Sequence, residues 1–272
     1  MTSALDTPST VSPPPQLPTI ELHGIRLHAL TEKQTISVIL DRLSRGEGGW
    51  VVTANLDHMR RLVHDAEYRK LCESACLLVA DGMPLVWASR LQRTALPERV
   101  AGSSLIWTLT EAAARRDRSI FLLGGAPGTA DRASTVFREE FPTLRIAGTH
   151  CPEFGFENRP ADIAVIADKI RASQPDIVFV ALGSPKQERL ISQIRSAAPT
   201  GWWIGVGISF SFVCGEVKRA PKWMQQLGIE WVHRLIQEPR RLARRYLVDD
   251  LPFVFKLFYS ALRARRPGRK CR

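Results

Sequence analysis

The stretch Asp176-Ile-Val-Phe-Val-Ala-Leu182 runs directly into Gly183-Ser-Pro-Lys-Gln187. After its leading aspartate the first segment is apolar throughout, which is typical of a strand buried on both faces of a parallel sheet. The second segment ends the strand with glycine and proline and then opens a helix. A buried strand that passes through a short polar turn into a helix is the repeating unit of an α/β fold.

The same unit recurs along the chain. Other apolar segments that end in a turn lie at residues 50–53, 76–80, 119–123 and 202–206. Helical patterns separate them, and the first of these helices opens with Thr31-Glu-Lys-Gln34, which has the spacing of a capping box. The alternation predicts an α/β fold of Rossmann-like type, with a doubly wound, mostly parallel sheet. We expect residues 1–19 to form a disordered leader, residues 20–215 the Rossmann-like domain and residues 216–272 a basic helical appendage.

The positive charge of the chain is concentrated at its C-terminal end. The sequence has 38 Lys+Arg and 27 Asp+Glu, a formal net charge of +11, and residues 231–272 carry +9 of it. Arg234, Arg241 and Arg244 are seven and three residues apart, a spacing that predicts one shared helix face. Basic and aromatic residues on short helices favour an anionic membrane surface over a solvated tail. We expect no nucleic-acid binding, because no fold signature for it accompanies the charge.

Cysteine usage and the first residues predict a cytoplasmic protein. The five cysteines are odd in number and scattered, which argues against a disulfide framework and for a reducing compartment. The first 18 residues have neither a basic start nor an apolar core, so they do not resemble a secretory signal. The longest weakly polar stretch, at 202–215, is too short and too rich in glycine and serine to span a bilayer.

Polar residues gather at the predicted carboxyl ends of the strands, where ligands bind in doubly wound sheets. Thr53 and Asn55 can cap the following helix or hydrogen-bond a sugar hydroxyl. Asp81 ends an apolar strand and is either a turn cap or a general base in a cleft. Ser184 and Gln187 have the spacing of a capping box, and the helix start that they define can also hold a ligand.

Gly124, Gly125 and Gly128 form a glycine turn between a strand and a helix. The N–H groups at such a helix start suit a diphosphate, although a simple tight turn explains the glycines equally well. The turn lacks the full dinucleotide or P-loop fingerprint, which counts against an enzyme that uses a dinucleotide or a methyl donor. The sequence has no zinc-protease motif, no complete nucleophile elbow and no set of metal ligands, so we expect no metal and no other cofactor.

Several motifs recur in one order and together resemble a known family. They are Thr53-x-Asn55, Ala80-Asp-Gly-Met-Pro-Leu-Val-Trp87, Glu98-Arg-Val-x-Gly102, Phe121-Leu-Leu-Gly-Gly-x-Pro-Gly128, Gly183-Ser-Pro-Lys-Gln-Glu188, Val217-Lys-Arg-Ala-Pro221 and Glu230-Trp231. Over about residues 20–247 the chain resembles the WecG/TagA/CpsF glycosyltransferases, glycosyltransferase family 26. The resemblance implies an inverting, metal-independent enzyme that moves a sugar from a UDP-sugar donor to an undecaprenyl-diphosphate-linked acceptor. It also implies work in exopolysaccharide or cell-surface polysaccharide synthesis, as a peripheral protein and a possible homo-oligomer on the cytoplasmic face of the bacterial inner membrane.

The resemblance also assigns roles to residues of this chain. It implies that Asp81 is the general base for the acceptor hydroxyl and that Thr53 and Asn55 line the same pocket. It places Gln187 and Arg99 among the substrate-binding residues. The remaining substrate-binding candidates are Ser184, the glycines of the 124–128 turn, and Arg234, Arg241 and Arg244, which the resemblance implies close over the site and engage diphosphate.

The chain departs from the family pattern at two positions. Family members commonly carry Asp where this chain has Ser104 and Ser211. Both differences remove a carboxylate near the expected site and bear on the sugar preference. They leave one alternative of a different class, a non-catalytic protein that binds nucleotide-sugar or serves as a scaffold in the same assembly.

Overall fold

A computed structural model describes residues 16–265 of the chain. The strands are β1 (Thr19–Leu22), β2 (Ile25–His28), β3 (Gly49–Ala54), β4 (Leu77–Ala80), β5 (Ser119–Gly124), β6 (Arg145–His150), β7 (Ile177–Ala181) and β8 (Trp202–Gly205). The helices are α1 (Glu32–Ser44), α2 (Leu56–His64), α3 (Ala66–Cys72), α4 (Met83–Gln92), α5 (Gly102–Arg115), α6 (Thr129–Glu140), α7 (Pro160–Ser173), α8 (Lys186–Ile194), α9 (Ser209–Val213), α10 (Lys222–Gln226), α11 (Glu230–Gln237), α12 (Pro239–Ala243) and α13 (Leu251–Ala264). Two 3₁₀ turns, η1 (Phe156–Asn158) and η2 (Arg195–Ala197), and one π-helical turn, η3 (Arg244–Asp250), complete the described elements. Most of the predicted leader, residues 1–15, lies outside the described residues, and β1 begins at Thr19.

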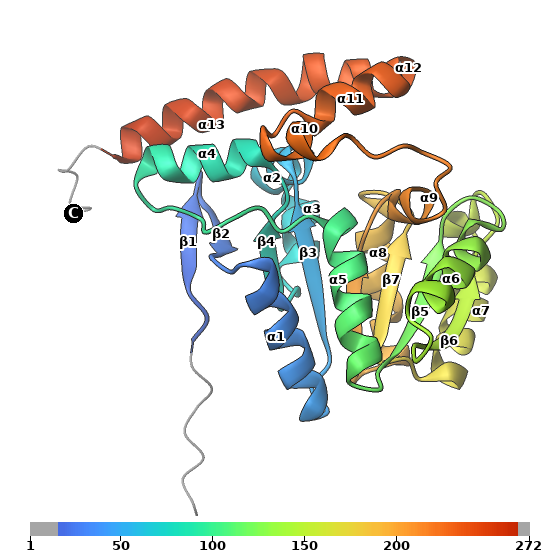
Figure 1. Cartoon of the computed structure of the whole chain (residues 1–272). Helices are drawn as coiled ribbons and strands as arrows, with labels where there is room; N and C mark the ends of the chain where they lie inside the picture. The colour runs from blue at the N-terminus through green and yellow to red at the C-terminus, as the bar shows by residue number, and fades with distance from the viewer. Residues whose placement is uncertain (1–15, 266–272) are drawn as a thin grey trace, which may run out of the picture.

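The main sheet has six strands in the order β4-β3-β8-β7-β5-β6, and each neighbouring pair is parallel. Helices flank it on both sides (Figure 1), which confirms the predicted α/β fold with a parallel sheet. The sequence patterns did not predict β6 or the antiparallel β1–β2 hairpin. β6 is an edge strand with no buried residue, and β1 has only one, so neither has a continuous apolar run.

Alternate side chains of the strands enter two separate apolar clusters. Trp50 and Val52 of β3 pack with α2, α3, α7, α8 and α13 on one face of the sheet. Val51 of the same strand packs with α1, α5, α6 and α9 on the other face. The neighbouring Trp202 and Trp203 of β8 divide between the two clusters in the same way, and both are almost fully buried. Burial on both faces is the reason that these strands read as continuous apolar runs.

The capping box predicted at the start of α1 is confirmed. Thr31 Oγ1 accepts from the Gln34 N–H over 3.1 Å, and Gln34 Oε1 accepts from the Thr31 N–H over 2.8 Å. Two of the unpaired N–H groups at the helix start are satisfied in this way, which fixes where the helix begins.

The C-terminal helices form a row across one end of the molecule, with α13 lying along α4 (Figure 1). Phe253, Leu257 and Ala261 of α13 are buried in the core. None of the helices in the described residues combines the length and apolar character needed to cross a bilayer.

The prediction that three arginines share one helix face is wrong. α11 ends at Gln237, Glu238 has φ −130° and ψ 57°, and a new helix starts at Pro239. A residue before proline is pushed away from helical geometry, so Glu238 breaks the helix. Arg234 therefore belongs to α11, whereas Arg241 belongs to α12 and Arg244 to η3.

Candidate functional site

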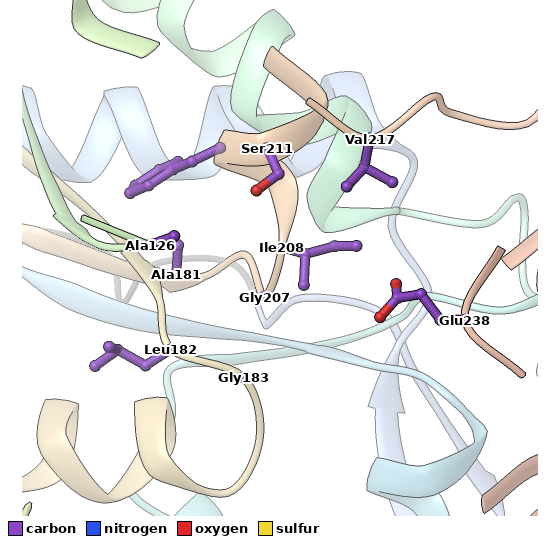
Figure 2. A pocket seen from close by; sticks show the side chains of 11 residues that line it. Ala126, Ala181, Leu182, Gly183, Gly207, Ile208, Ser211, Val217 and Glu238 are labelled. Atoms are coloured by element: carbon purple, nitrogen blue, oxygen red, sulfur yellow. The ribbon is translucent and has the colours of Figure 1, made fainter. Parts of the chain in front are cut away.

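The carboxyl ends of the parallel strands lie at one edge of the sheet, and the turns after β5, β7 and β8 border a pocket of about 430 Å³. The pocket is lined by Gly125, Ala126, Ala181, Leu182, Gly183, Gly207, Ile208, Phe210, Ser211, Val217 and Glu238. Figure 2 shows the Ser211 hydroxyl and the Glu238 carboxylate at its border, with the turns after β7 and β8 between them. Ligand sites in open parallel sheets lie at this edge, so the pocket is in the expected place.

Asp81 and Thr53 meet at the start of α5. Asp81 Oδ2 accepts from the N–H of Gly102, the first residue of that helix, over 3.3 Å. Thr53 is buried and donates to the Gly205 carbonyl over 3.4 Å. A Cβ on Gly102 would lie 3.2 Å from Thr53 Oγ1, so glycine lets the helix start approach the Thr53 side chain closely. Asp81 thus contacts a helix start, although it is that of α5 and not that of the next helix in the chain.

Burial raises the pKa of the Asp81 carboxyl, nearby Arg99 lowers it, and Glu230 raises it again, so that the net effect is a raised pKa. Arg99 does not act on Asp81 as an isolated cation, because its Nη1 donates to Glu230 Oε2 over 3.0 Å. A carboxylate with a raised pKa is a stronger base at neutral pH than an exposed one. The surroundings of Asp81 therefore suit proton abstraction.

Glu230 and Arg219 are site residues that sequence reasoning did not select. Arg219 Nη2 donates to Ser104 Oγ over 2.9 Å, and its Nε lies 3.4 Å from Glu230 Oε1. Ser104, one of the two departures from the family pattern, thus belongs to a hydrogen-bonded group that ties α5 to α11. The Glu230-Trp231 motif was the one signal in the sequence that pointed to Glu230. Its pairing with Arg99 spans 131 positions, so no local pattern could predict that contact.

Asn55 is the N-cap of α2, as one of the two interpretations of this residue predicted. Its Oδ1 accepts from the His58 N–H over 3.2 Å and lies 3.5 Å from Arg245 Nη2. Arg245 is half-buried, whereas its predicted neighbour Arg244 is exposed. Arg245 is thus the arginine that lies beside Asn55, and the role of Arg244 at the site stays a prediction.

The other predicted arginines differ in their surroundings. Arg234 is half-buried, and its Nε has no hydrogen-bond partner among the described residues. A buried guanidinium nitrogen of this kind is able to bind an anionic ligand. The side chain of Arg241 lies outside the described part of the structure.

The capping box predicted at Ser184 is wrong. α8 begins at Lys186 without a side-chain cap, and Ser184 Oγ instead lies 3.2 Å from the Tyr68 hydroxyl. Gln187 is almost fully buried, its Oε1 accepts from the Gly207 N–H over 3.1 Å, and its Nε2 donates to Glu188 Oε1 over 2.8 Å. These bonds hold the turn after β8, so the side chain of Gln187 points into the sheet and not back to the helix start.

The glycine turn after β5 brings that strand close to β7. Gly124 has φ +102°, and a Cβ there would lie 2.6 Å from the Ala181 carbonyl oxygen. Gly125 lines the pocket, and Gly128 is the N-cap of α6. A carboxylate already lies at that helix start, because Glu216 accepts from Thr129 Oγ1 over 3.2 Å and also pairs with Arg132. The tight-turn interpretation therefore explains Gly124, whereas Gly125 remains placed for a ligand.

A buried charge cluster ties the appendage to α2. Asp57 pairs with Arg60 over 2.6 Å and with Arg61 over 3.2 Å on its own helix. Arg245 of η3 lies 3.4 Å from Asp57 and 3.7 Å from Asp250, and both carboxylates are buried. This cluster holds Arg245 beside Asn55. Among the described residues, no group of three or more His, Cys, Asp or Glu side chains is arranged to bind a metal ion.

Comparison with known proteins gives consistent matches. The model of the family described as "Glycosyl transferase WecG/TagA/CpsF family" matches residues 20–267. An N-acetylglucosaminyldiphosphoundecaprenol N-acetyl-beta-D-mannosaminyltransferase of Bacillus spizizenii is 33% identical over 202 residues, covering 74% of this chain and 76% of the relative. A protein of the same name from Bacillus subtilis is 34% identical over 197 residues, covering 72% of this chain and 75% of the relative.

Proposed function

Because the chain belongs to the WecG/TagA/CpsF family of glycosyl transferases, we propose that it transfers a sugar from a UDP-sugar to an undecaprenyl-diphosphate-linked acceptor, with inversion at the anomeric carbon. The chain is a glycosyltransferase; the donor, the acceptor and the stereochemistry are the proposal. The observation that carries it is Asp81, whose pKa is raised by burial at the carboxyl edge of the sheet. We further propose a role in exopolysaccharide or cell-surface polysaccharide synthesis.

The reaction assigns one step to Asp81. Its carboxylate takes the proton of an acceptor hydroxyl, and the hydroxyl oxygen attacks the anomeric carbon of the donor. A new C–O bond forms as the bond from that carbon to the diphosphate oxygen breaks, and the electron pair leaves with UDP. One direct displacement of this kind inverts the anomeric centre. Thr53 and Asn55 lie on the neighbouring strand and helix start, where they would contact the reacting sugars.

The UDP part of the donor would occupy the pocket beside Gly125 and Gly183. Gly124, Gly128 and Ser184 would shape its walls, because their backbones form the turns after β5 and β7. Arg234 and Arg245 would stabilise the diphosphate, since guanidinium groups neutralise the charge that develops on a leaving phosphate without a metal ion. We retain Arg99, Arg241 and Arg244 as substrate-binding candidates and assign Gln187 to holding the pocket wall.

The names of the relatives indicate which acceptor to test first. Both are named for transfer of N-acetylmannosamine to N-acetylglucosaminyldiphosphoundecaprenol. We therefore propose a lipid-linked N-acetylglucosaminyl diphosphate as the acceptor. Such an acceptor is held in a bilayer, so we also propose that the protein works as a peripheral protein on the cytoplasmic face of the inner membrane.

The first experiment measures UDP release by the purified protein with a short-chain prenyl-diphosphate N-acetylglucosamine, across a panel of UDP-sugars. Acceptor-dependent release with one donor is expected, and Asp81→Asn should lower it by about 100-fold or more because the general base is lost. Asp117→Asn, at an exposed carboxylate on the opposite end of β5, is the matched control. UDP binding without release for any donor, with equal binding by Asp81→Asn, would favour a non-catalytic nucleotide-sugar-binding protein.

A further inference from the structure

A buried chain of hydrogen bonds, which the reaction step above does not use, crosses the site beneath Asn55. It joins α2, α8 and the turn after β8 through Asn55, His58, Glu188, Gln187 and Gly207. His58 Nδ1 lies 2.7 Å from Asn55 Oδ1, and His58 Nε2 lies 3.4 Å from Glu188 Oε1. Gln187 Nε2 donates to the same Glu188 oxygen, and the Gly207 N–H donates to Gln187 Oε1. His58, Gln187 and Glu188 are each at most 6% exposed, so water does not compete for these bonds.

The partners of His58 fix the orientation of its ring. The backbone N–H of His58 donates to Asn55, so the acceptor atom must be the carboxamide oxygen, and Nδ1 must carry a proton to approach the same oxygen. The other ring nitrogen, Nε2, faces the buried Glu188 carboxyl. Burial by itself raises the pKa of Glu188, but hydrogen bonds from His58, Gln187 and Ser184 lower it overall. The ring is therefore held between Asn55 and Glu188.

The His58 ring determines which end of the Asn55 side chain is engaged by the protein. Asn55 Oδ1 is engaged by the backbone and the ring of His58 and lies near Arg245. Within residues 16–265 the Asn55 amide nitrogen donates to no protein acceptor. In the described part of the chain, the two donors of the NH₂ group are therefore the part of the carboxamide that other protein groups do not engage.

We propose that His58 and Glu188 are positioning residues, which hold Asn55 so that its NH₂ group donates to an oxygen of the bound sugar substrate. The inference rests on the proposed function, because it needs a substrate that carries acceptor oxygens beside Asp81. A sugar hydroxyl or a diphosphate oxygen has the required chemistry. The other end of the hydrogen-bonded chain, from Gln187 to Gly207, holds the wall of the donor pocket and does not involve His58.

The kinetic test uses His58→Gln and Glu188→Gln, with His64→Gln, an exposed histidine on the same helix, as the matched control. Each site variant should lower kcat by about 10- to 100-fold, since misplacing a substrate contact by about 1 Å costs this much. The affinity for UDP, measured by calorimetry, should stay within about twofold of that of the unmodified protein, because Gln187 still holds Gly207. A general structural defect would lower both kcat and the affinity for UDP.

The role of Asn55 is isolated by adding His58→Gln to Asn55→Ala. If His58 acts through Asn55, the second substitution should cause no further loss of kcat, because the group that it positions is already gone. A further loss in the Asn55→Ala background would overturn the proposal, as would a kcat for His58→Gln equal to that of the unmodified protein.

A spectroscopic test needs no turnover. In protein labelled with ¹⁵N-histidine, the Nδ1 signal of His58, assigned by its disappearance in His58→Gln, should have the chemical shift of a nitrogen that carries a proton, because Nδ1 donates to Asn55. Asn55→Ala should change this shift, whereas His64→Gln should leave it as in the unmodified protein. An Nδ1 without a proton in the unmodified protein would overturn the inference, even if the transfer reaction itself proved to be different.

Discussion

At the scale of single residues, the site depends on charged neighbours that act in opposite directions on the pKa of the Asp81 carboxyl. Burial raises its pKa, Arg99 opposes that effect, and Glu230 in turn draws the Arg99 guanidinium to itself. A fully unopposed buried carboxylate would stay protonated, and one paired directly with arginine would be a weak base. The opposed effects of Arg99 and Glu230 on Asp81 are the arrangement that we propose for the general base.

Glu230→Gln should shift the pH dependence of kcat. Removal of this carboxylate leaves the positive charge of Arg99 without the negative charge of Glu230 beside it, so Arg99 acts more strongly on Asp81. The pKa of Asp81 therefore falls. The general base acts when ionised, so activity rises with pH through that pKa, and the acidic limb of the profile should move to lower pH in the variant. The plateau rate should fall by less than about tenfold, because the base becomes weaker but remains present.

The measurement is the pH–rate profile of UDP release, with Glu111→Gln as the control, since Glu111 pairs with Arg115 at the far end of α5. An unchanged or upward-shifted acidic limb in Glu230→Gln would mean that Glu230 does not tune Asp81.

At the scale of elements, the sequence predicted strands best where every residue of the strand is buried. Residues 177–181 are buried on both faces of the sheet, so their apolar run indicated a strand directly. β6 has no buried residue and gave no such signal. Gln187 resembled a cap because the spacing is local, but its bond to the Gly207 N–H, 20 positions away, depends on how α8 packs beside β8.

The arginines of the appendage illustrate the same limit. The seven- and three-residue spacing predicted that Arg234, Arg241 and Arg244 share one face of a continuous helix. The break at Glu238 and the π-helical turn end that continuity, and Arg245 lies beside Asn55. The charge composition predicted that arginines of the appendage bind an anionic partner. Which arginine lies beside Asn55 depends on the helix geometry, which residue spacing alone does not give.

Helix α13 behaves as part of the core. Leu257 is fully buried between this helix and the body, whereas Leu262 on the same helix is 47% exposed. Leu257→Ala should lower the free energy of unfolding by about 2–5 kcal/mol, the usual cost of a cavity at a buried leucine. Leu262→Ala should change it by less than about 0.5 kcal/mol. Urea unfolding of both variants tests this, and equal midpoints would show that α13 is not anchored to α4 as described.

At the scale of the whole molecule, most of the large exposed apolar residues of the described structure belong to the C-terminal helices. The appendage exposes Trp223, Leu227, Trp231, Ile236, Leu247, Val248, Leu251, Phe255, Tyr259 and Leu262. Residues 231–272 also carry most of the net charge. An apolar and cationic surface on helices that do not span a bilayer is typical of binding to the surface of an anionic membrane.

Ile236→Glu and Phe255→Glu should each weaken binding to vesicles that contain anionic lipid by about tenfold, because each removes a large exposed apolar side chain from the contact. Val165→Glu, at a comparably exposed position on α7, is the control and should bind as the unmodified protein does. Cosedimentation with vesicles at low and high salt measures the effect. Equal loss in all three variants would mean that added negative charge, and not this surface, controls binding.

The position of β8 in the sheet has a consequence for biosynthesis. β8 is the last strand to be made, yet it lies between β3 and β7 and joins the two halves of the sheet. Until residues 202–205 have left the ribosome, β3 with β4 and β5 with β6 and β7 exist only as separate parts with exposed edges. The nascent chain therefore carries unpaired strands through most of its translation, and a message truncated before this point yields an aggregation-prone product with no site at all.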